Sequence, residues 1–415
     1  MKRWQWAVRL LTRRMWFRAA LFCLFAVGLA LAGALIGHAI PYSFATKVGA
    51  KSVDNILGLL ASSMLTVTTF SLATMVSAYA GATSNITPRA VQLLIDDPAA
   101  QNALATFLGA FLFAIVGIIA LSTGLYGETG RVILYAGTIV VIVLIVVTLV
   151  RWIEYVARFG RVSDSIERVE RAAMAAVREM TERPRSGPGA IATFPEDATV
   201  VRHDGIGRIT HVDLVEIAAV AAEIGARITV ASLPGALTDP VRVLAWTKGR
   251  LDPRQTRRVA GAFTIATQRA FDHDPRFGLV VLAEIAARAL SPAVNDPGTA
   301  IAVIEAGTRV LAAMLRHDPD PSRLPADVDV APVMLADLIG DFYRPIERYG
   351  AGSTEVAIRL QKSLATLAAV EPQIQADCRA EAAAAFSRSR AELSNDSDRR
   401  DLSDVHHRCW DAVRV

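Results

Sequence analysis

Cysteine is scarce in this sequence, with only Cys23, Cys378 and Cys409 in 415 residues. No two of them form a CxxC pair, so neither a disulfide framework nor a zinc site of four close ligands is indicated. Histidine is scattered as well, and His406 and His407 approach Cys409 only in a polar C-terminal stretch. We therefore predict no bound metal.

Motifs that carry enzyme chemistry are also missing. The chain has no nucleophile elbow, phosphate-binding loop, HExxH helix or dinucleotide-binding fingerprint, the patterns by which several large enzyme classes are read from sequence. No spacing of Ser, His and Asp singles out a catalytic triad. The sequence thus predicts no catalytic residue and no cofactor, and we expect the protein not to be an enzyme.

Charge is sparse in the first part of the chain. Charged residues make up 20% of the whole and apolar residues 53%, which exceeds the usual globular share of apolar residues. A helix needs about 20 apolar residues to cross a bilayer, and four stretches meet this length, at 17–40, 56–80, 103–124 and 132–150. We predict a domain of four transmembrane helices within residues 1–155, whose first helix is retained and not cleaved as a signal peptide.

The distribution of basic residues predicts an orientation. The connection after the first predicted span holds only Lys47 and Lys51, and the one after the third only Arg131. Basic residues gather instead before the first span and after the fourth, at Lys2, Arg3, Arg9, Arg13, Arg14, Arg18, Arg151, Arg158, Arg161, Arg168 and Arg171. The positive-inside bias therefore places both termini in the cytoplasm. Because this excess lies beside the membrane, we assign the net charge of +4 to contact with the lipid bilayer and expect no nucleic-acid partner.

The second predicted span is rich in hydroxyl groups. On a helix that turns about 100° per residue, one face carries Ser62, Thr66, Thr69 and Ser77, with Ala73 and Ala80 between and after them. Hydroxyl groups in hydrocarbon need hydrogen-bond partners, so we expect this face to turn toward protein or water. Two interpretations stay open: a seam of close helix packing through small residues, or one wall of a solvated pathway that oligomerisation completes.

Ionisable side chains are absent from the depth of all four stretches. An ionisable residue at the membrane midplane is the usual mark of a proton or ion relay, so the sequence argues against a proton-coupled transporter. A weakly selective channel lined by hydroxyl groups or apolar side chains remains compatible with it.

After the spans we predict an amphipathic linking helix at 156–185, a small β-rich module at 186–250, a cytoplasmic helical domain at 251–395 and a polar tail at 396–415. In the module, 198–203 and 207–212 are β-type runs joined by DGIG, a hairpin signal, and 227–232 and 241–246 are two more. Asp213 and Gly225 mark the ends of one helix among them. The predicted fold class is an α-helical integral membrane domain followed by a cytoplasmic α+β region, mainly helical with a small β-rich module.

The dipeptide Asp-Pro recurs every 22 residues, at Asp252, Asp274, Asp296 and Asp318. An Asp side chain accepts hydrogen bonds from the first free amides of a helix, and Pro fits the first helical position. The spacing predicts three helices of nearly equal length, each opened by the same cap, in a short antiparallel bundle.

The corner RALSPAVNDPGTAIAVIEAG, residues 288–307, concentrates Ser291, Asn295, Asp296 and Thr299 between two helices. Helix capping is one account of these residues. The other is a cytoplasmic surface for a ligand or a partner protein, helped by free helix amides that favour an anion.

A second candidate stretch, TPRAVQLLIDDP, follows the second span and joins Arg89 to Asp97. One interpretation is capping of a short interfacial helix with Arg89 among the lipid headgroups. The other is an element that couples the spans to the cytoplasmic domain.

Three stretches together carry a family resemblance. They are FSLATMVSAYAGATSNITPRAVQLLIDDPAAQNALATFLGAFLFAIVG, HDPRFGLVVLAEIAARALSPAVNDPGTAIAVIEAG and IERYGAGSTEVAIRLQKSL. They are similar, in this order, to a family of predicted bacterial membrane proteins known as domain of unknown function 2254. The resemblance implies a protein of the bacterial inner membrane with four spans and a cytoplasmic C-terminal half, and it carries no activity with it.

Two functional hypotheses follow from these patterns. The first is a homo-oligomeric channel or permeation protein gated by its cytoplasmic domain. The second is a membrane-anchored sensor or scaffold that binds a ligand or a protein through that domain.

Overall fold

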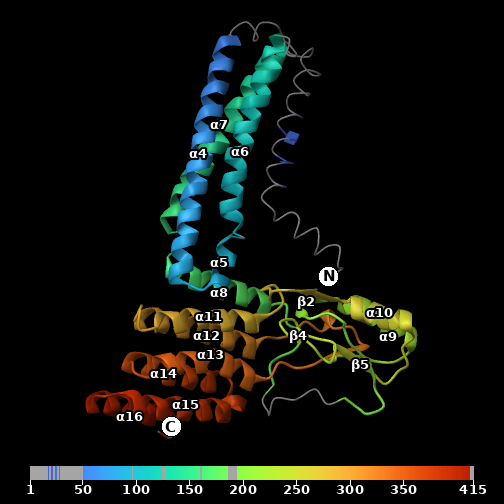
Figure 1. Ribbon diagram of the computed structural model, residues 1–415, viewed down its shortest axis with the longest axis vertical. Coiled ribbons are helices and arrows are strands. Elements are labelled where there is room, and N and C mark those ends of the chain that lie inside the picture. Colours follow the sequence, from blue (N-terminus) through green and yellow to red (C-terminus); the bar gives the residue numbers. More distant parts are fainter. Residues whose placement is uncertain are drawn as a thin grey trace. The chain divides into compact units, whose positions relative to one another are not determined.

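The long apolar runs after residue 50 form three helices, α4 (Ala50–Asn85), α6 (Pro98–Ser122) and α7 (Glu128–Arg158) (Figure 1). A short amphipathic helix, α5 (Pro88–Ile95), lies between the first two. Helix α6 begins at Pro98, and Asp97 caps it by accepting a hydrogen bond of 2.7 Å from the amide of Ala99. The computed structural model describes residues 17, 20–21, 24–25, 28, 50–95, 97–123, 128–158, 161–185 and 194–411.

The described residues divide into two compact units. The span unit comprises the described residues within 3–84 and 91–161, and the αβ unit comprises those within 85–90 and 162–415. The chain therefore passes from one unit to the other at the end of α4, between Ser84 and Asn85, then inside α5, between Ala90 and Val91, and again just before α8 (Val162–Val177).

The span unit has an apolar core between α4, α6 and α7. Small residues of α6 allow the helices to approach closely. At Gly117, for example, an added Cβ would meet Cδ1 of Leu57 from α4 at 3.0 Å and Cδ1 of Leu134 from α7 at 3.5 Å. Close approach through small residues is the usual way in which apolar helices pack in a membrane.

Four of the described helices are long and apolar enough to cross a membrane, at Val53–Gly81, Pro98–Ser122, Val132–Ala157 and Pro297–Arg316. The first three coincide with the predicted spans at 56–80, 103–124 and 132–150, which confirms these helices. The predicted first span, 17–40, lies for the most part outside the described residues.

The fourth of these helices is α12 (Pro297–Arg316), which falls in the segment predicted to be cytoplasmic. It belongs to the αβ unit and packs against α8, α11, α13 and α14. Its Arg309 bonds Glu170 of α8 at 2.6 Å, and its Glu305 lies 3.2 Å from Arg359 of α14. Most apolar side chains of α12 are thus buried against neighbouring helices, and two of its charged side chains are paired. We therefore interpret α12 as the central helix of the αβ unit and not as a membrane span.

The helices of the αβ unit lie in successive layers (Figure 1). Beyond α8 and α12 they are α9 (Leu214–Ile224), α10 (Pro253–Gly261), α11 (Pro275–Ala289), α13 (Leu335–Gly350), α14 (Thr354–Val370), α15 (Gln375–Glu392) and α16 (Asp396–Trp410), with the 3-10 turns η2 (Pro321–Arg323) and η3 (Pro372–Ile374). Helix α8, predicted as part of an amphipathic linker, buries Ile166, Val169 and Ala173 in packing against α11 and α12. It is thus a part of these layers.

Two small sheets stand beside the helical layers. One has the strand order β1-β5-β3-β7 and the other β4-β2-β6. The strands are β1 (Thr199–Val201), β2 (Gly207–Val212), β3 (Ile228–Val230), β4 (Leu237–Thr238), β5 (Ala245–Thr247), β6 (Phe263–Ala266) and β7 (Val328–Val330). All pairs are antiparallel except β3 with β7.

The predicted hairpin of 198–203 with 207–212 is wrong. Its two runs are strands β1 and β2, but β1 pairs with β5 whereas β2 pairs with β4 and β6. The predicted module of residues 186–250 also omits two strands of the observed sheets. These strands, β6 and β7, come from the segment predicted to be helical. Alternation of side chains marks a strand without naming its partner, so the sequence could indicate these strands but not their pairing.

The Asp-Pro caps are confirmed at three of four positions. Side chains of Asp252, Asp274 and Asp296 accept hydrogen bonds from the first turns of α10, α11 and α12. Asp318 opens no described helix, because α12 ends at Arg316 and the following turn, η2, is capped by Asp320. The expected lengths are also wrong for α10, which has nine residues and gives way to β6, a β-branched and aromatic run that pairs with β2.

Residues 396–410, predicted as a polar tail, form helix α16, capped by Asn395. This helix buries Leu402, Val405 and Trp410 and packs against α14 and α15. The apolar residues are few but spaced to share one face, which explains why a mostly polar sequence still packs.

Candidate functional site

The predicted hydroxyl face lies on the outer side of α4. Its members, Ser62, Thr66, Thr69 and Ser77, are all exposed. At about 100° per residue they lie opposite Leu57 and Met64, which are buried in the core of the span unit. Within the described residues, this face is therefore not buried against α6 or α7.

Three hydroxyl groups of this face bond to their own helix. Ser62 donates to the carbonyl of Leu59 at 3.1 Å, Thr66 to that of Ser62 at 3.0 Å and Thr69 to that of Leu65 at 3.0 Å. A hydroxyl that donates to a carbonyl one turn earlier is satisfied even in hydrocarbon. The expectation that this face must turn toward protein or water therefore loses its energetic basis, and its role stays a prediction.

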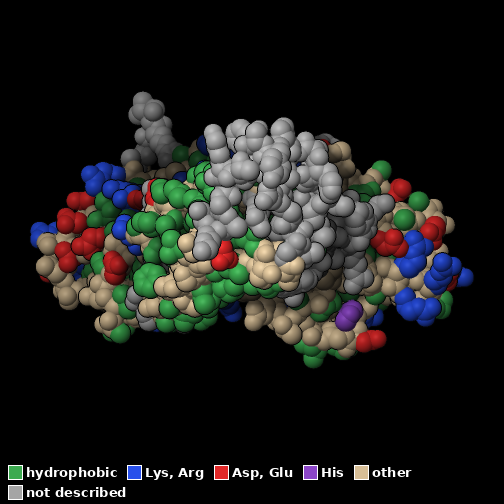
Figure 2. Space-filling model, turned by 90° about the horizontal axis from the view of Figure 1, so that it is seen from above, with side chains coloured by type: hydrophobic (Ala, Val, Ile, Leu, Met, Phe, Trp, Pro, Cys, Tyr) green, Lys and Arg blue, Asp and Glu red, His purple; other side chains and the backbone are tan. Residues whose placement is uncertain are grey.

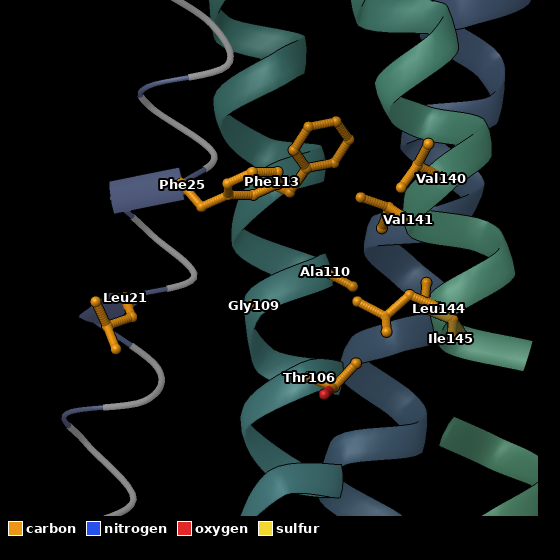
Figure 3. Close-up of a pocket in the computed structure, with 10 residues that line it drawn as sticks. All are labelled: Leu21, Phe25, Thr106, Gly109, Ala110, Phe113, Val140, Val141, Leu144 and Ile145. Carbon is orange, nitrogen blue, oxygen red and sulfur yellow. The ribbon is translucent and has the colours of Figure 1, made fainter. Parts of the chain in front are cut away.

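A cavity of about 350 Å³ lies among α6, α7 and two residues of the N-terminal segment (Figure 3). Its lining consists of Leu21, Phe25, Thr106, Gly109, Ala110, Phe113, Val140, Val141, Leu144 and Ile145. Among these only Thr106 has a polar side chain, and its hydroxyl donates to the carbonyl of Asn102 at 2.8 Å. The described lining residues suit an apolar occupant, and none of them carries a charge.

Asp97, a predicted coupling residue, is buried and has two roles within the span unit. Besides capping α6, its second carboxylate oxygen accepts a hydrogen bond of 3.1 Å from the hydroxyl of Tyr155 on α7. The sequence marked Asp97 as a coupling candidate, whereas its cap of α6 and its bond to Tyr155, 58 residues further along the chain, come from the structure. Asp97 thus fixes the start of α6 against α7.

Arg89, the other predicted coupling residue, forms an ion pair with Glu284 of α11 within the αβ unit. Glu284 is half-buried and is the only acid in the mainly apolar stretch GLVVLAEIAARA, whose other charged residue is Arg288. Desolvation raises the pKa of its carboxyl group, and the Arg89 guanidinium opposes that rise. A lone acid in an apolar helical run is the signal by which the sequence could have suggested such a partner.

Replacing Arg89 by glutamine is expected to destabilise the αβ unit by about 1 kcal/mol at neutral pH, the upper value for an exposed pair. Because the pKa of Glu284 is raised in the folded state, its contribution to stability is greatest below the unfolded pKa of about 4.3. This contribution is lost as the pH rises through the folded value. Without Arg89 the pKa of Glu284 rises further, so the loss should be smaller at about pH 4. Thermal midpoints at both pH values measure this. The double variant Arg89→Gln, Glu284→Gln should recover stability at neutral pH, and an equal loss at both pH values would contradict the pairing.

A second ion pair, of Asp274 with Arg269, is buried at the start of α11. The two side chains are 4% and 17% exposed and 2.7 Å apart, and Arg269 also lies over the ring of Phe277 at 4.8 Å. Gly235, with φ of 90°, brings its backbone against this pair, where any Cβ would overlap the Asp274 carboxylate. This ion pair therefore holds the β3–β4 turn against the start of α11.

The corner between α11 and α12 is built from local hydrogen bonds. Ser291 donates through Oγ to the carbonyl of Arg288 at 2.7 Å and ends the preceding helix. Asn295 has φ of 49°, a left-handed conformation that Asn adopts more readily than most residues. Asp296 accepts from the amide of Thr299 at 3.0 Å and from its hydroxyl at 2.6 Å. Backbone conformation and capping therefore account for all four predicted residues, and a ligand at the corner stays a prediction.

Replacing Asp296 by alanine should lower the free energy of unfolding by about 1 kcal/mol, the usual value of an N-cap. The hydrogen bonds from Thr299 hold the pKa of this carboxyl group below its usual value. Its contribution is thus fully present above the unfolded pKa of about 3.9 and is lost as the pH falls toward the folded value. Denaturation curves at neutral and acid pH measure both effects. Asp318→Ala is the matched control, because this Asp-Pro caps no described helix, and an equal loss in the two variants would contradict the assignment.

The fold and these contacts define a class of protein: an α-helical membrane protein with a separate, mainly helical unit that carries two small sheets. The chain belongs to the family described as predicted membrane protein (DUF2254), whose model matches residues 12–366. This match confirms the family resemblance of the sequence. Searches among curated proteins and among solved structures gave no match to the chain.

Proposed function

We propose that this protein is a homo-oligomeric channel, or permeation protein, of the bacterial inner membrane. Both termini and the αβ unit would lie in the cytoplasm, as the positive-inside distribution predicts, and the αβ unit would control opening. The observation that carries the proposal is the exposure of the hydroxyl face of α4 on the side opposite its core.

The composition of that face supports subunit association. Ser, Thr and Ala are enriched where membrane helices meet, because small side chains let two backbones approach closely. On α4 such residues follow one another along the exposed side, while larger exposed side chains, including Phe70 and Leu72, flank them. A second copy of α4 could therefore approach along this line.

The same face could line a pathway around the symmetry axis of an oligomer. No Asp, Glu, Lys, Arg or His occurs in residues 56–80, so such a pathway would lack strong charge selectivity and would not carry protons along ionisable side chains. Uncharged solutes and weakly selected ions are the permeants that this lining suits.

Control of opening would run through α5, within which the chain passes between the two units. Its first turn carries Arg89, paired with Glu284 of α11, and the chain just after its end carries Asp97, bonded to Tyr155 of α7. A rearrangement of α11 would act on α5 through the first contact, and the chain from α5 to Asp97 would carry it to the start of α6.

Cysteine substitution at Thr66 and Thr69 tests the pathway, in a background without Cys23, Cys378 and Cys409. If the proposal holds, a water-soluble thiol reagent modifies both positions in the membrane, and oxidation links two subunits through them. Leu72→Cys, exposed on the flank of α4, is the matched control and should remain unmodified. The proposal would be contradicted if the cysteines at positions 66 and 69 are neither modified by the reagent nor linked by oxidation.

A second candidate function is a membrane-anchored sensor or scaffold, in which the αβ unit binds a ligand or a protein. The internal hydrogen bonds of Ser62, Thr66 and Thr69 favour it, because such a face is stable against lipid alone. Unreactive cysteines at these positions would select this candidate, and linkage without modification would select an oligomer with a dry seam.

A further inference from the structure

Four exposed cations of the αβ unit lie close together in the chain, around the start of α10. Lys248 and Arg250 follow strand β5, and Arg254 and Arg257 lie on α10. All four side chains are exposed, and none forms an ion pair or a side-chain hydrogen bond with the residues that the structure describes. Arg254 and Arg257, three residues apart, share one face of the helix.

Arg258, the next residue on α10, differs from these four cations because it is paired with acids. Arg258 bonds Glu216 and Glu223 of α9, both at 2.7 Å. Together with the buried Val259 and the capping box of Asp252 with Gln255, these bonds fix α10 against α9. Arg254 and Arg257 are thus displayed from a helix that is held in place, with Lys248 and Arg250 just before it in the chain.

The local charge is strongly positive. Residues 248–258 contain five cations and a single acid, Asp252, whose carboxylate is already occupied by the amides of Arg254 and Gln255. Figure 2 shows several Lys and Arg side chains gathered at the right-hand end of the view, the end at which Figure 1 places α9 and α10. We call Lys248, Arg250, Arg254 and Arg257 the α10 basic surface.

We propose that the α10 basic surface binds the anionic headgroups of a lipid bilayer. Guanidinium groups form paired, charge-assisted hydrogen bonds with phosphate oxygens, and each cation near an anionic membrane adds to the attraction. Nucleic acid carries the same phosphate chemistry, but the chain is a membrane protein, so a bilayer is tethered to this surface permanently and at high effective concentration.

Contact of this surface with lipid would restrain the sheets and α9–α10 near the membrane. The inference requires only that the chain resides in a membrane. It is independent of permeation and of oligomerisation, and the outcome of its test does not depend on them.

A fluorescent label at position 261 tests the contact in the full-length protein. Gly261 ends α10, and an added Cβ there meets nothing within 4 Å, so Gly261→Cys in the background without Cys23, Cys378 and Cys409 should fold normally. The labelled protein is placed in nanodiscs that contain a headgroup nitroxide quencher, with either phosphatidylcholine alone or a mixture with phosphatidylglycerol. We expect quenching to rise with the anionic lipid and to fall to the neutral-lipid level in 1 M salt, where the screening length is about 3 Å.

Substitution of all four cations of the α10 basic surface by glutamine should abolish this rise. The matched control removes the same charge elsewhere on the surface, through Arg316→Gln, Arg348→Gln, Arg400→Gln and Arg408→Gln, and should leave it intact. A label at Gly352, where a Cβ also meets open space, should not respond to lipid composition.

Equal quenching in neutral and anionic nanodiscs would overturn the proposal. So would a rise that survives the four substitutions in the α10 basic surface. A label that responds to an added oligonucleotide and not to anionic lipid would assign this surface to nucleic acid instead.

Discussion

Replacing Gly307 by alanine is expected to destabilise the αβ unit by about 2 kcal/mol. Gly307 lies on α12, and a Cβ there would overlap the ring of Phe342 on α13, which is fully buried. Overpacking of this severity costs about 3 kcal/mol, and the better helix propensity of alanine returns about 1 kcal/mol. For a unit of this size the thermal midpoint should fall by about 4–8 °C.

The matched control for this variant is Gly261→Ala in α10. A Cβ there enters open space, so only the gain in helix propensity remains, and the midpoint should rise slightly or stay unchanged. Adding Phe342→Leu to Gly307→Ala should recover part of the loss, since the smaller side chain relieves the overlap. If Gly307→Ala raises the midpoint as Gly261→Ala does, the packing of α12 against α13 is contradicted.

Replacing Gln361 by leucine is expected to release α16 from the unit. Oε1 of Gln361 accepts a hydrogen bond of 3.0 Å from Nε1 of Trp410 and lies 2.9 Å from Nδ1 of His406, while its Nε2 donates to the carbonyl of Ala382 at 2.9 Å. The side chain is 1% exposed. Leucine would leave these groups without partners, at a cost of about 2–4 kcal/mol.

Hydrogen exchange of the full-length protein measures the release. A cost of this size corresponds to faster exchange of the α16 amides by about 30-fold to 1,000-fold, while the amides of α11 keep their rate. Gln373→Leu makes the same chemical change at an exposed position and should leave α16 unaffected. Unchanged protection of α16 in the Gln361 variant would show that its apolar face alone holds it.

Features of this fold that depend on neighbouring residues could be predicted from the sequence. The caps at Asp213, Asp252, Asp274 and Asp296 and the left-handed stop at Gly225 are set by side chains within a few positions of the backbone they bond. The spans at 56–80, 103–124 and 132–150 were predictable for a similar reason, because length and apolar composition suffice to define a span.

Features that depend on distant residues could not be predicted in the same way. Strand β7 pairs with β3 across about 100 residues, and Arg89 meets Glu284 across 195. Nothing in either local pattern names the other partner. Asp318 shows that a local capping pattern can also mislead. Asp-Pro caps only a helix that follows it, and at Asp318 helix α12 has just ended.

The hydroxyl face of α4 has one feature that the sequence predicts and one that it does not. Its existence follows from helical periodicity, and the structure places it opposite the buried residues. That the hydroxyl groups of Ser62, Thr66 and Thr69 are satisfied inside the helix depends on side-chain rotamers, which periodicity does not specify. Among the candidate residues, Arg89 and Asp97 gained specific partners, whereas the corner residues proved to form a self-contained turn.

Solute flux through liposomes that contain the purified protein, with its subunit number determined in the same preparation, tests the proposed function most directly. We expect an oligomer that conducts small uncharged solutes or weakly selected ions. Thr66→Phe should reduce the flux and Leu72→Phe should not, because only the first side chain lies on the hydroxyl face. A protein that remains monomeric and gives no flux would contradict the account.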